Sequence, residues 1–224
     1  MPELPQDLWT AVDSYLSATL LPRDPILDAA LNSSAEAGLP PIAVTPTLGK
    51  FLHLLARIIN AKKILEVGTL GGYSTIWLAR ALPPTGRVIT LEYDPKHAEI
   101  AQKNFRLAGL EKIIELRVGK ALDTLPEIAA ADPAPFDLIF IDADKQNNPA
   151  YFQWALKLSR PGTLILIDNV VRDGAILDAA SADPAIQGTR QLLTLLGNEP
   201  RVSVTALQTV DAKGHDGFAL ALVL

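Results

Sequence analysis

Five short apolar runs, each with glycine or an acidic residue at or near its end, constrain the fold of this chain more than any other feature. They cover residues 62–68, 87–93, 113–119, 136–143 and 163–170, and segments of helical spacing separate them. Near-continuous apolar strands that alternate with helices are typical of a parallel sheet with helices on both faces. We therefore predict an α/β, Rossmann-like fold.

Helical patterns fill the gaps between these runs. Thr45 is a candidate N-cap, and Pro46 suits the first helical position of the segment that follows it. Leu48, Phe51, Leu52 and Leu55 then share one helical face. Further helices are predicted over residues 73–82, between Asp94 and Gly109, over about 120–130 and from Asn148 to about 159.

The two ends of the chain depart from the alternating pattern. Residues 202–210 and 218–224 are two strand patterns joined by "DAKGHDG", with no room for a helix between them. We expect them to form an antiparallel hairpin at one edge of the sheet, which makes seven strands. The first 44 residues carry helical patches broken by prolines. They predict a helical cap on the core at 45–224, within a single domain of 1–224.

Composition narrows the class of protein. Of the 224 residues, 49% are hydrophobic and 20% charged, so a large core is available, and no apolar stretch approaches the roughly 20 residues that cross a bilayer. The N-terminus lacks the pattern of a secretory signal. There are no cysteines, which excludes disulfides and thiolate sites, and the net charge of −5 disfavours a nucleic-acid surface. We expect a soluble, cytoplasmic protein without nucleic-acid or membrane partners.

The stretch "LEVGTLGGYS" (65–74) predicts a ligand site at the end of the first strand. A glycine turn between a strand and a helix lets a ligand approach the backbone and exposes the N–H groups of the helix. Glu92 ends the next strand and can accept hydrogen bonds from a ribose diol. Together they indicate a nucleoside pocket, although Leu70 breaks the dinucleotide-binding glycine pattern. The alternative is a purely structural turn beside a solvated Glu92.

The fourth and fifth strands end in a second group of polar residues. If these strands are neighbours, about 4.8 Å apart, Asp142, Asp168 and Asn169 converge. Two close carboxylates repel each other unless a cation or a proton lies between them. Oxygen ligands of this kind are preferred by hard divalent cations such as Mg²⁺. The alternative is that Asp168 and Asn169 cap the following helix.

Lys145 follows Asp142 by three residues, and a nearby cation would disfavour its charged form and make it a base. The alternative is an ordinary surface lysine.

The stretches "ILEVGTLGGYS" (64–74), "FIDADKQN" (140–147) and "IDNVVRDG" (167–174) resemble, in this order and spacing, the cation-dependent, S-adenosylmethionine-dependent O-methyltransferases, the group of caffeoyl-CoA and catechol O-methyltransferases. The resemblance runs from about Thr45 to the C-terminus.

This resemblance implies the class I methyltransferase fold and assigns roles to particular residues. Lys145 and Asp142 match catalytic positions. The metal ligands would be Asp142, Asp168 and Asn169, holding Mg²⁺ or Mn²⁺, with Ca²⁺ as a third candidate. Positions that match contacts to the methyl donor are Val44, Glu66, Gly68, Thr69, Gly72, Ser74, Glu92, Ala121, Asp142 and Asp144.

The resemblance also implies an activity. S-adenosylmethionine would donate a methyl group to one hydroxyl of a vicinal diphenol, such as a catechol, a flavonoid or a caffeoyl compound, with the help of a divalent cation. The family relationship implies a homodimer. Leu48-Gly49-Lys50 departs from the Glu-Gly-Gln of many plant members, which argues against a plant-type acyl-CoA acceptor. Alternative functions are a nicotinamide-dependent dehydrogenase, an Asp-x-Asp phosphatase and a non-catalytic protein that binds the nucleoside.

Overall fold

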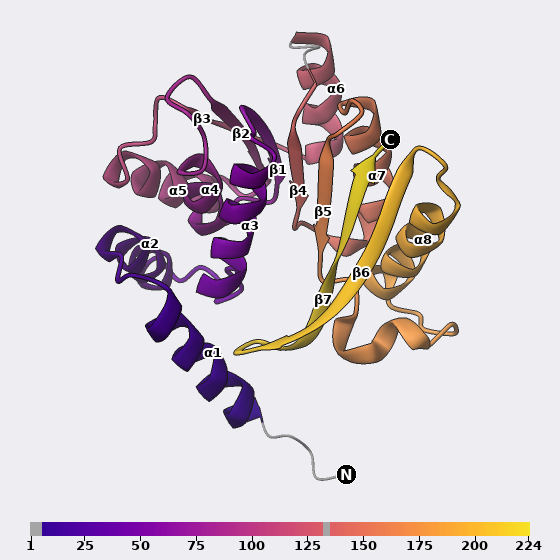
Figure 1. The fold of residues 1–224 in the computed structure, drawn as a ribbon, viewed down its shortest axis with the longest axis horizontal. Helices are drawn as coiled ribbons and strands as arrows, with labels where there is room; N and C mark the ends of the chain where they lie inside the picture. Colours follow the sequence, from indigo (N-terminus) through magenta and orange to yellow (C-terminus); the bar gives the residue numbers. More distant parts are fainter. Residues whose placement is uncertain (1–5, 132–134) are drawn as a thin grey trace.

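The computed structural model describes residues 6–131 and 135–224 and contains one seven-stranded sheet (Figure 1). Its spatial order is β3-β2-β1-β4-β5-β7-β6. The first five strands are parallel, and β7 runs antiparallel to both β5 and β6. This confirms the predicted mostly parallel sheet with a C-terminal hairpin. The strands are β1 Lys63–Val67, β2 Arg87–Glu92, β3 Ile114–Val118, β4 Leu138–Ile141, β5 Leu164–Asp168, β6 Val202–Asp211 and β7 Gly214–Val223.

Helices cover both faces of the sheet, and each layer has its own apolar core (Figure 1). One core joins helices α2 to α5 to the sheet, with Leu52, Ile76 and Phe105 fully or almost fully buried. The other joins α6 to α8, with Leu125, Phe152 and Leu192 buried. The helices are α1 Gln6–Leu20, α2 Pro25–Glu36, α3 Pro46–Ile58, α4 Tyr73–Ala79, α5 Pro95–Leu107, α6 Ala121–Ala131, α7 Asn148–Lys157 and α8 Pro184–Asn198, with short 3₁₀ segments η1 Lys145–Asn147 and η2 Arg172–Leu177.

The helix starts follow the capping chemistry expected from the sequence. The Thr45 side chain accepts a hydrogen bond from the backbone N–H of Leu48, and Pro46 opens α3. Asp94 accepts from the N–H groups of Lys96 and His97 at the start of α5. These side-chain acceptors satisfy N–H groups that have no partner within the helix, so the strand-to-helix junctions are fixed by local sequence.

The register of the sheet decides which strand ends meet. In the parallel pair β4–β5, Ile141 lies opposite Ile167, so Asp142 and Asp168 follow side by side. This confirms that the two acid-ended strands are neighbours. In the pair β1–β2, Glu66 lies opposite Thr90. The polar ends of all five parallel strands therefore lie along one edge of the sheet, where open α/β sheets bind ligands.

The C-terminal hairpin is longer than the sequence predicts. The strands β6 and β7 take in most of the expected seven-residue loop and leave only Ala212 and Lys213 as the turn. Gly214, with a φ of 122°, and a hydrogen bond from the Lys213 N–H to Asp211 Oδ1 at 2.7 Å allow this tight connection. The loop prediction was wrong because residues 215–217 pair with residues 208–210 and extend the ladder, despite the polar, glycine-rich composition of "DAKGHDG".

Two helices, α8 and α1, complete the fold. The sequence reading gave no element for residues 185–201, where the structure forms most of α8 and packs Leu192 and Leu196 into the core. Helix α1 has no buried residue and lies against the hairpin and α3 (Figure 1). Among the described residues, no helix is both long and apolar enough to cross a membrane.

Candidate active site

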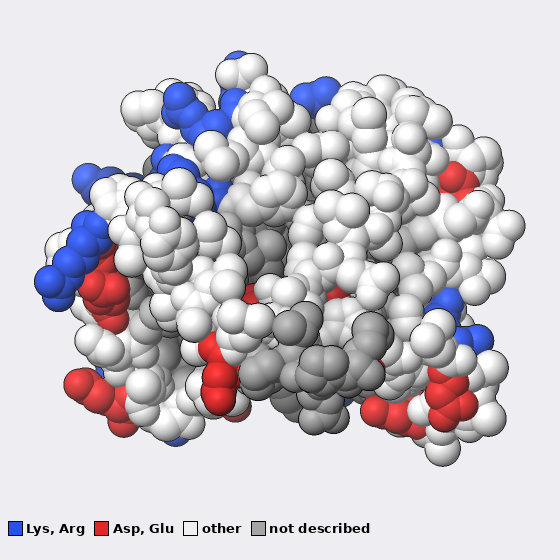
Figure 2. Space-filling model, turned by 60° about the horizontal axis from the view of Figure 1, so that its bottom comes forward, with Lys and Arg blue, Asp and Glu red and all other residues white. Residues whose placement is uncertain are grey.

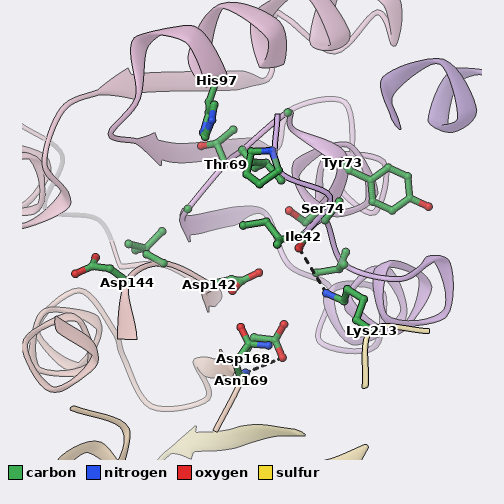
Figure 3. A pocket seen from close by; sticks show the side chains of 18 of the residues that line it. Ile42, Thr69, Tyr73, Ser74, His97, Asp142, Asp144, Asp168, Asn169 and Lys213 are labelled. Atoms are coloured by element: carbon green, nitrogen blue, oxygen red, sulfur yellow. Dashed lines mark hydrogen bonds between the residues drawn. The ribbon is translucent and has the colours of Figure 1, made fainter. Parts of the chain in front are cut away.

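A cavity of roughly 1390 Å³ lies at the carboxyl ends of the parallel strands. Figure 2 brings this side of the molecule forward; charged side chains gather toward its margins, and the middle of the described surface is mostly uncharged. Most of the residues singled out from the sequence line the cavity: Val44, Gly68, Thr69, Ser74, Glu92, Ala121, Asp142, Asp144, Lys145, Asp168 and Asn169. Of these, Figure 3 labels Thr69, Ser74, Asp142, Asp144, Asp168 and Asn169.

The turn after β1 requires glycine because the chain passes very close to β4. A Cβ atom on Gly68 would lie 2.0 Å from the backbone oxygen of Asp142, and the φ of Gly68 is 101°. Leu70 occupies the position where the dinucleotide pattern has a glycine, and it adopts a left-handed φ of 50°. That conformation costs a residue with a side chain about 1–2 kcal/mol. The turn therefore needs an external anchor.

Glu92 is that anchor. Its Oε2 accepts hydrogen bonds from the N–H groups of Thr69, at 3.2 Å, and Leu70, at 2.7 Å. Its Oε1 accepts from the N–H of Asp94 at 2.9 Å and lies 3.6 Å from Nδ1 of His97. The carboxylate is buried, so the alternative of a solvated glutamate does not hold. Glu92 lines the cavity and at the same time holds the glycine turn in place.

Glu66 and Gly72 are the two predicted site residues that do not line the cavity. Glu66 is 0% exposed, and its two oxygens accept hydrogen bonds from the hydroxyls of Ser74, Thr75 and Thr90. Burial raises the pKa of this carboxyl to about 7, although the three hydroxyl donors act in the opposite direction. Its oxygens are therefore already engaged behind the cavity wall, and Glu66 supports the residues that face the ligand.

Gly72 has a structural place of its own. It precedes α4 with a φ of 83°, and a Cβ atom there would lie 2.4 Å from the Phe105 ring. The backbone therefore passes directly over this ring at the start of the helix. Gly72 shapes the turn without facing the cavity.

The ends of β4 and β5 bring Asp142, Asp168 and Asn169 together (Figure 3). Asp168 is only 4% exposed; its Oδ1 accepts from the N–H of Asn169 at 2.9 Å. Its Oδ2 is buried without a hydrogen-bond partner in the part of the chain that the structure describes. Burial first, and then the charge of Asp142, raise the pKa of Asp168 to about 7. This carboxylate lacks the partner that a buried charge needs.

The helix-capping alternative for Asp168 and Asn169 is not supported. The next helical segment, η2, begins at Arg172, and the side chain that accepts from its first N–H groups is that of Asp216, not that of Asp168 or Asn169. Asn169 has a φ of 61°, a left-handed conformation that turns the chain sharply at the end of the strand. No group of three His, Cys, Asp or Glu side chains suited to a metal occurs among the described residues, and the set here has two carboxylates and one amide.

Lys145 lies inside the site. Its Nζ is 2.8 Å from Oδ1 of Asp142, and its side chain is only 10% exposed, which removes the surface-lysine alternative. Asp144 is engaged elsewhere, because it accepts hydrogen bonds from the Tyr151 hydroxyl and from Nδ2 of Asn147. Burial and Asp144 raise the pKa of Tyr151. Lys145 is thus an amine held against one carboxylate at the wall of the cavity.

Two cavity residues were not assigned from the sequence. Lys213 and His215 reach the cavity from the hairpin. Thr90 lies beside Glu66 because the two residues face each other in the β1–β2 register, and it belongs to none of the sequence motifs. That pairing was accessible once the first two strands were placed in parallel. The position of Lys213 was not, because it depends on a turn of two residues.

Comparison with known proteins identifies the family. The O-methyltransferase family model matches residues 17–222. A catechol O-methyltransferase from Niastella koreensis is 57% identical over 216 residues, which are 96% of this chain and 98% of that protein. The solved O-methyltransferase from Bacillus cereus in complex with SAH has 57% identity and a TM-score of 0.97, covering 98% of this chain and 100% of that chain. TomG, an O-methyltransferase from Streptomyces achromogenes solved with SAM, has 48% identity and a TM-score of 0.95, covering 98% and 99%.

The chain belongs to the O-methyltransferase family. This confirms the expected enzyme class, an S-adenosylmethionine-dependent O-methyltransferase with a Rossmann-like fold. The dehydrogenase and phosphatase alternatives were wrong.

Proposed function

We propose that this enzyme methylates one hydroxyl of a vicinal diphenol and depends on a divalent cation to do so. The observation that carries the proposal is the buried Asp168 beside Asp142, with one oxygen left without a protein partner. A relative named catechol O-methyltransferase, 57% identical, supports the acceptor class. Catechols, flavonoids and caffeoyl compounds all carry the required pair of adjacent hydroxyls.

The residues present suit a divalent cation. Asp142, Asp168 and Asn169 offer two carboxylates and an amide oxygen, the donor set that Mg²⁺ and Mn²⁺ prefer, and Ca²⁺ also accepts such ligands. A cation would supply the missing partner of Asp168 and offset the repulsion between the two acids. Bound there, it would make the phenolic oxygens more acidic and hold them in place.

The methyl donor is proposed to lie along the ends of β1, β2 and β3. Glu92 would accept hydrogen bonds from the ribose hydroxyls, and Ala121 would lie beside the adenine. Val44, Gly68, Thr69 and Ser74 would surround the methionine part, with Asp142 and Asp144 on the side toward β4. All of these residues line the cavity, which supports this placement.

Lys145 is proposed to remove the phenolic proton. Its Nζ lies 2.8 Å from Asp142, so the amine is held where that metal ligand would face the acceptor. In the reaction, the deprotonated oxygen attacks the methyl carbon, the carbon–sulfur bond breaks, and its electron pair stays on sulfur. The sulfonium is already an activated leaving group, so the enzyme supplies mainly deprotonation and alignment.

We further propose a homodimer, which the family resemblance implies. Helix α1 has no buried residue and exposes an apolar surface that a second copy can cover, formed by Leu8, Val12, Tyr15, Leu16 and Leu20. Light scattering coupled to size-exclusion chromatography tests this. A monomer at micromolar concentration contradicts the proposal.

The decisive experiment is a methylation assay with catechol and with phenol, before and after treatment with EDTA. We expect the catechol to be methylated, the phenol to react poorly, and EDTA to stop turnover until Mg²⁺ or Mn²⁺ is restored. Full activity after EDTA treatment would contradict the cation. Equal rates for phenol and catechol would contradict the role of the second hydroxyl.

A further inference from the structure

The tip of the β6–β7 hairpin brings a lysine to the cavity. Lys213 is one of the two turn residues, and its Nζ lies 3.5 Å from the backbone oxygen of Ile42, in the segment that leads into α3. Figure 3 shows its side chain pointing toward Ile42, with a dashed line for this contact. Lys213 lines the same cavity as Asp168 and Asn169, so its charge faces the space beside the proposed metal ligands.

The turn that carries Lys213 is anchored from outside the hairpin. Nε2 of Gln6 donates to the backbone oxygen of Asp211 at 2.9 Å. The N–H of Ala212 donates to Oδ2 of Asp13 at 3.4 Å, and Oδ1 of Asp13 accepts from the Thr47 hydroxyl at 3.0 Å. Helix α1 therefore ties the hairpin tip to the first turn of α3, and the origin of the Lys213 side chain is fixed at the mouth of the cavity.

Lys213 differs from the neighbouring cations in its partners. Lys145 is paired with Asp142, and Arg172 lies 3.8 Å from Asp216. Within the described ranges, Lys213 has no carboxylate at ion-pair distance, and the backbone oxygen of Ile42 is the hydrogen-bond acceptor of its Nζ.

The acids near the tip are engaged with backbone donors. Asp211 accepts from the N–H of Lys213 at 2.7 Å, and Asp173 accepts from the N–H of His215 at 3.3 Å. Asp216 accepts from the N–H groups of Val171 and Arg172, at 2.9 and 3.0 Å. The cationic head that remains open to a ligand on this side of the cavity is that of Lys213.

We propose that Lys213 selects the acceptor: its ammonium favours diphenols that carry a carboxylate on the ring or on a short side chain. This inference rests on the proposed function and deepens it. The two hydroxyls would face Asp168 and Lys145, while the carboxylate would lie toward the hairpin tip. An opposite charge at the mouth of a partly desolvated cavity also draws in anionic acceptors and repels cationic ones.

Three acceptors of similar shape test the inference: 3,4-dihydroxybenzoate, its neutral methyl ester and the cationic 3,4-dihydroxybenzylamine. In the native enzyme we expect kcat/KM to fall in that order. In Lys213→Met, kcat/KM for the benzoate should fall about fivefold relative to the ester, and Lys213→Arg should restore the preference. Raising the salt concentration should weaken the benzoate preference in the native enzyme and leave Lys213→Met unaffected.

Lys112→Met is the matched control, because Lys112 is exposed and does not line the cavity; it should keep the native order of acceptors. An equal loss for all three acceptors in Lys213→Met would overturn the inference and leave the proposed function intact. A weaker affinity of Lys213→Met for the methyl donor, measured by calorimetry without acceptor, would also overturn it, since Lys213 would then bind the donor carboxylate. Failure of the native enzyme to methylate any of the three contradicts the proposed function itself.

Discussion

The two halves of the cavity hold their carboxylates in opposite ways. At the ends of β1 and β2, Glu66 and Glu92 receive hydrogen bonds from hydroxyls and backbone N–H groups on both of their oxygens. At the end of β5, Asp168 receives one N–H bond and keeps a buried oxygen without a partner among the described residues. The pKa of Glu66 and the pKa of Asp168 are both raised to about 7, but only that of Asp168 is raised by a close second acid as its next cause after burial.

In one half of the cavity the protein itself satisfies the buried carboxylates. In the other half one carboxylate oxygen needs a ligand as its partner. A buried carboxylate with three donors is satisfied by the protein, so the side proposed to bind the nucleoside is preformed. A buried carboxylate that faces another acid is satisfied only by a proton or a cation. The donor half should therefore tolerate loss of the cation, and the other half should not.

The largest effect is expected from Asp168→Asn, which removes one formal charge from the cation site and keeps the side-chain size. Turnover should fall more than about 100-fold, because even second-sphere partners of a metal account for 10–100-fold in affinity. Saturating Mg²⁺ should raise the melting temperature of the native enzyme and not that of the variant. Donor affinity, measured by calorimetry, should stay within about threefold. Unchanged turnover in the variant would show that the acids at β4 and β5 do not form a working site.

Lys145→Met tests the base on the same side of the cavity. We expect the rate to fall by about 10²–10⁴, the usual contribution of a positioned base, with donor and Mg²⁺ binding retained. A variant that keeps the native rate would assign the proton transfer to another group.

Glu92→Ala tests the other half. The substitution removes the acceptor of two turn N–H groups and the proposed partner of the ribose hydroxyls. Affinity for the methyl donor should fall by roughly 1.5–3 kcal/mol, while Mg²⁺ binding is kept. Calorimetric titration with S-adenosylmethionine measures the loss, and an affinity equal to that of the native enzyme would contradict the role of Glu92.

Glu66→Gln is expected to have the smallest effect on activity and a distinct effect on stability. The pKa of Glu66 is raised from 4.5 to about 7 in the folded enzyme, so the folded state keeps a proton that the unfolded state releases. Folding stability should therefore decrease as the pH rises from about 4.5 to about 7, by roughly 3 kcal/mol from this group alone.

Chemical denaturation at several pH values checks this prediction. The amide does not ionise, so the difference in unfolding free energy between Glu66→Gln and the native enzyme should grow in favour of the variant over that range. Parallel pH profiles for the two proteins would mean that Glu66 stays ionised.

The order of elements and the pairing of strand ends could be predicted because local patterns determine them. The apolar runs gave β1 to β5, and the pair Asp94–Pro95 gave the start of α5. The adjacency of Asp142 and Asp168 follows from the geometry of neighbouring parallel strands, whose carboxyl ends lie side by side. Such features depend on periodicity, capping and sheet geometry, and windows of about 10 residues are enough to recognise them.

What escaped the sequence depends on contacts between distant segments. Glu66 is the last residue but one of β1, near the edge of the sheet where ligands bind, but its burial arises from Ser74, Thr75 and Thr90 closing over it. Lys213 reaches the cavity only because the hairpin turn has two residues and because Gln6 and Asp13 hold it. Neither set of contacts follows from a periodic pattern in the sequence. The motifs therefore predict the residues at the strand ends but not the residues that surround and hold them.

The placement of β7 has a consequence for how this protein is made. It is synthesised after the other six strands of this sheet, yet it lies between β5 and β6, which both hydrogen-bond to it. During synthesis, at about 5–20 residues per second, the nucleoside half can assemble while β6 still has no partner in the sheet. For roughly a second or two the nascent chain then presents two unpaired strand edges, the situation in which chains pair with one another by mistake. The half proposed to bind the acceptor is thus the last to form and the part most exposed to misassembly during synthesis.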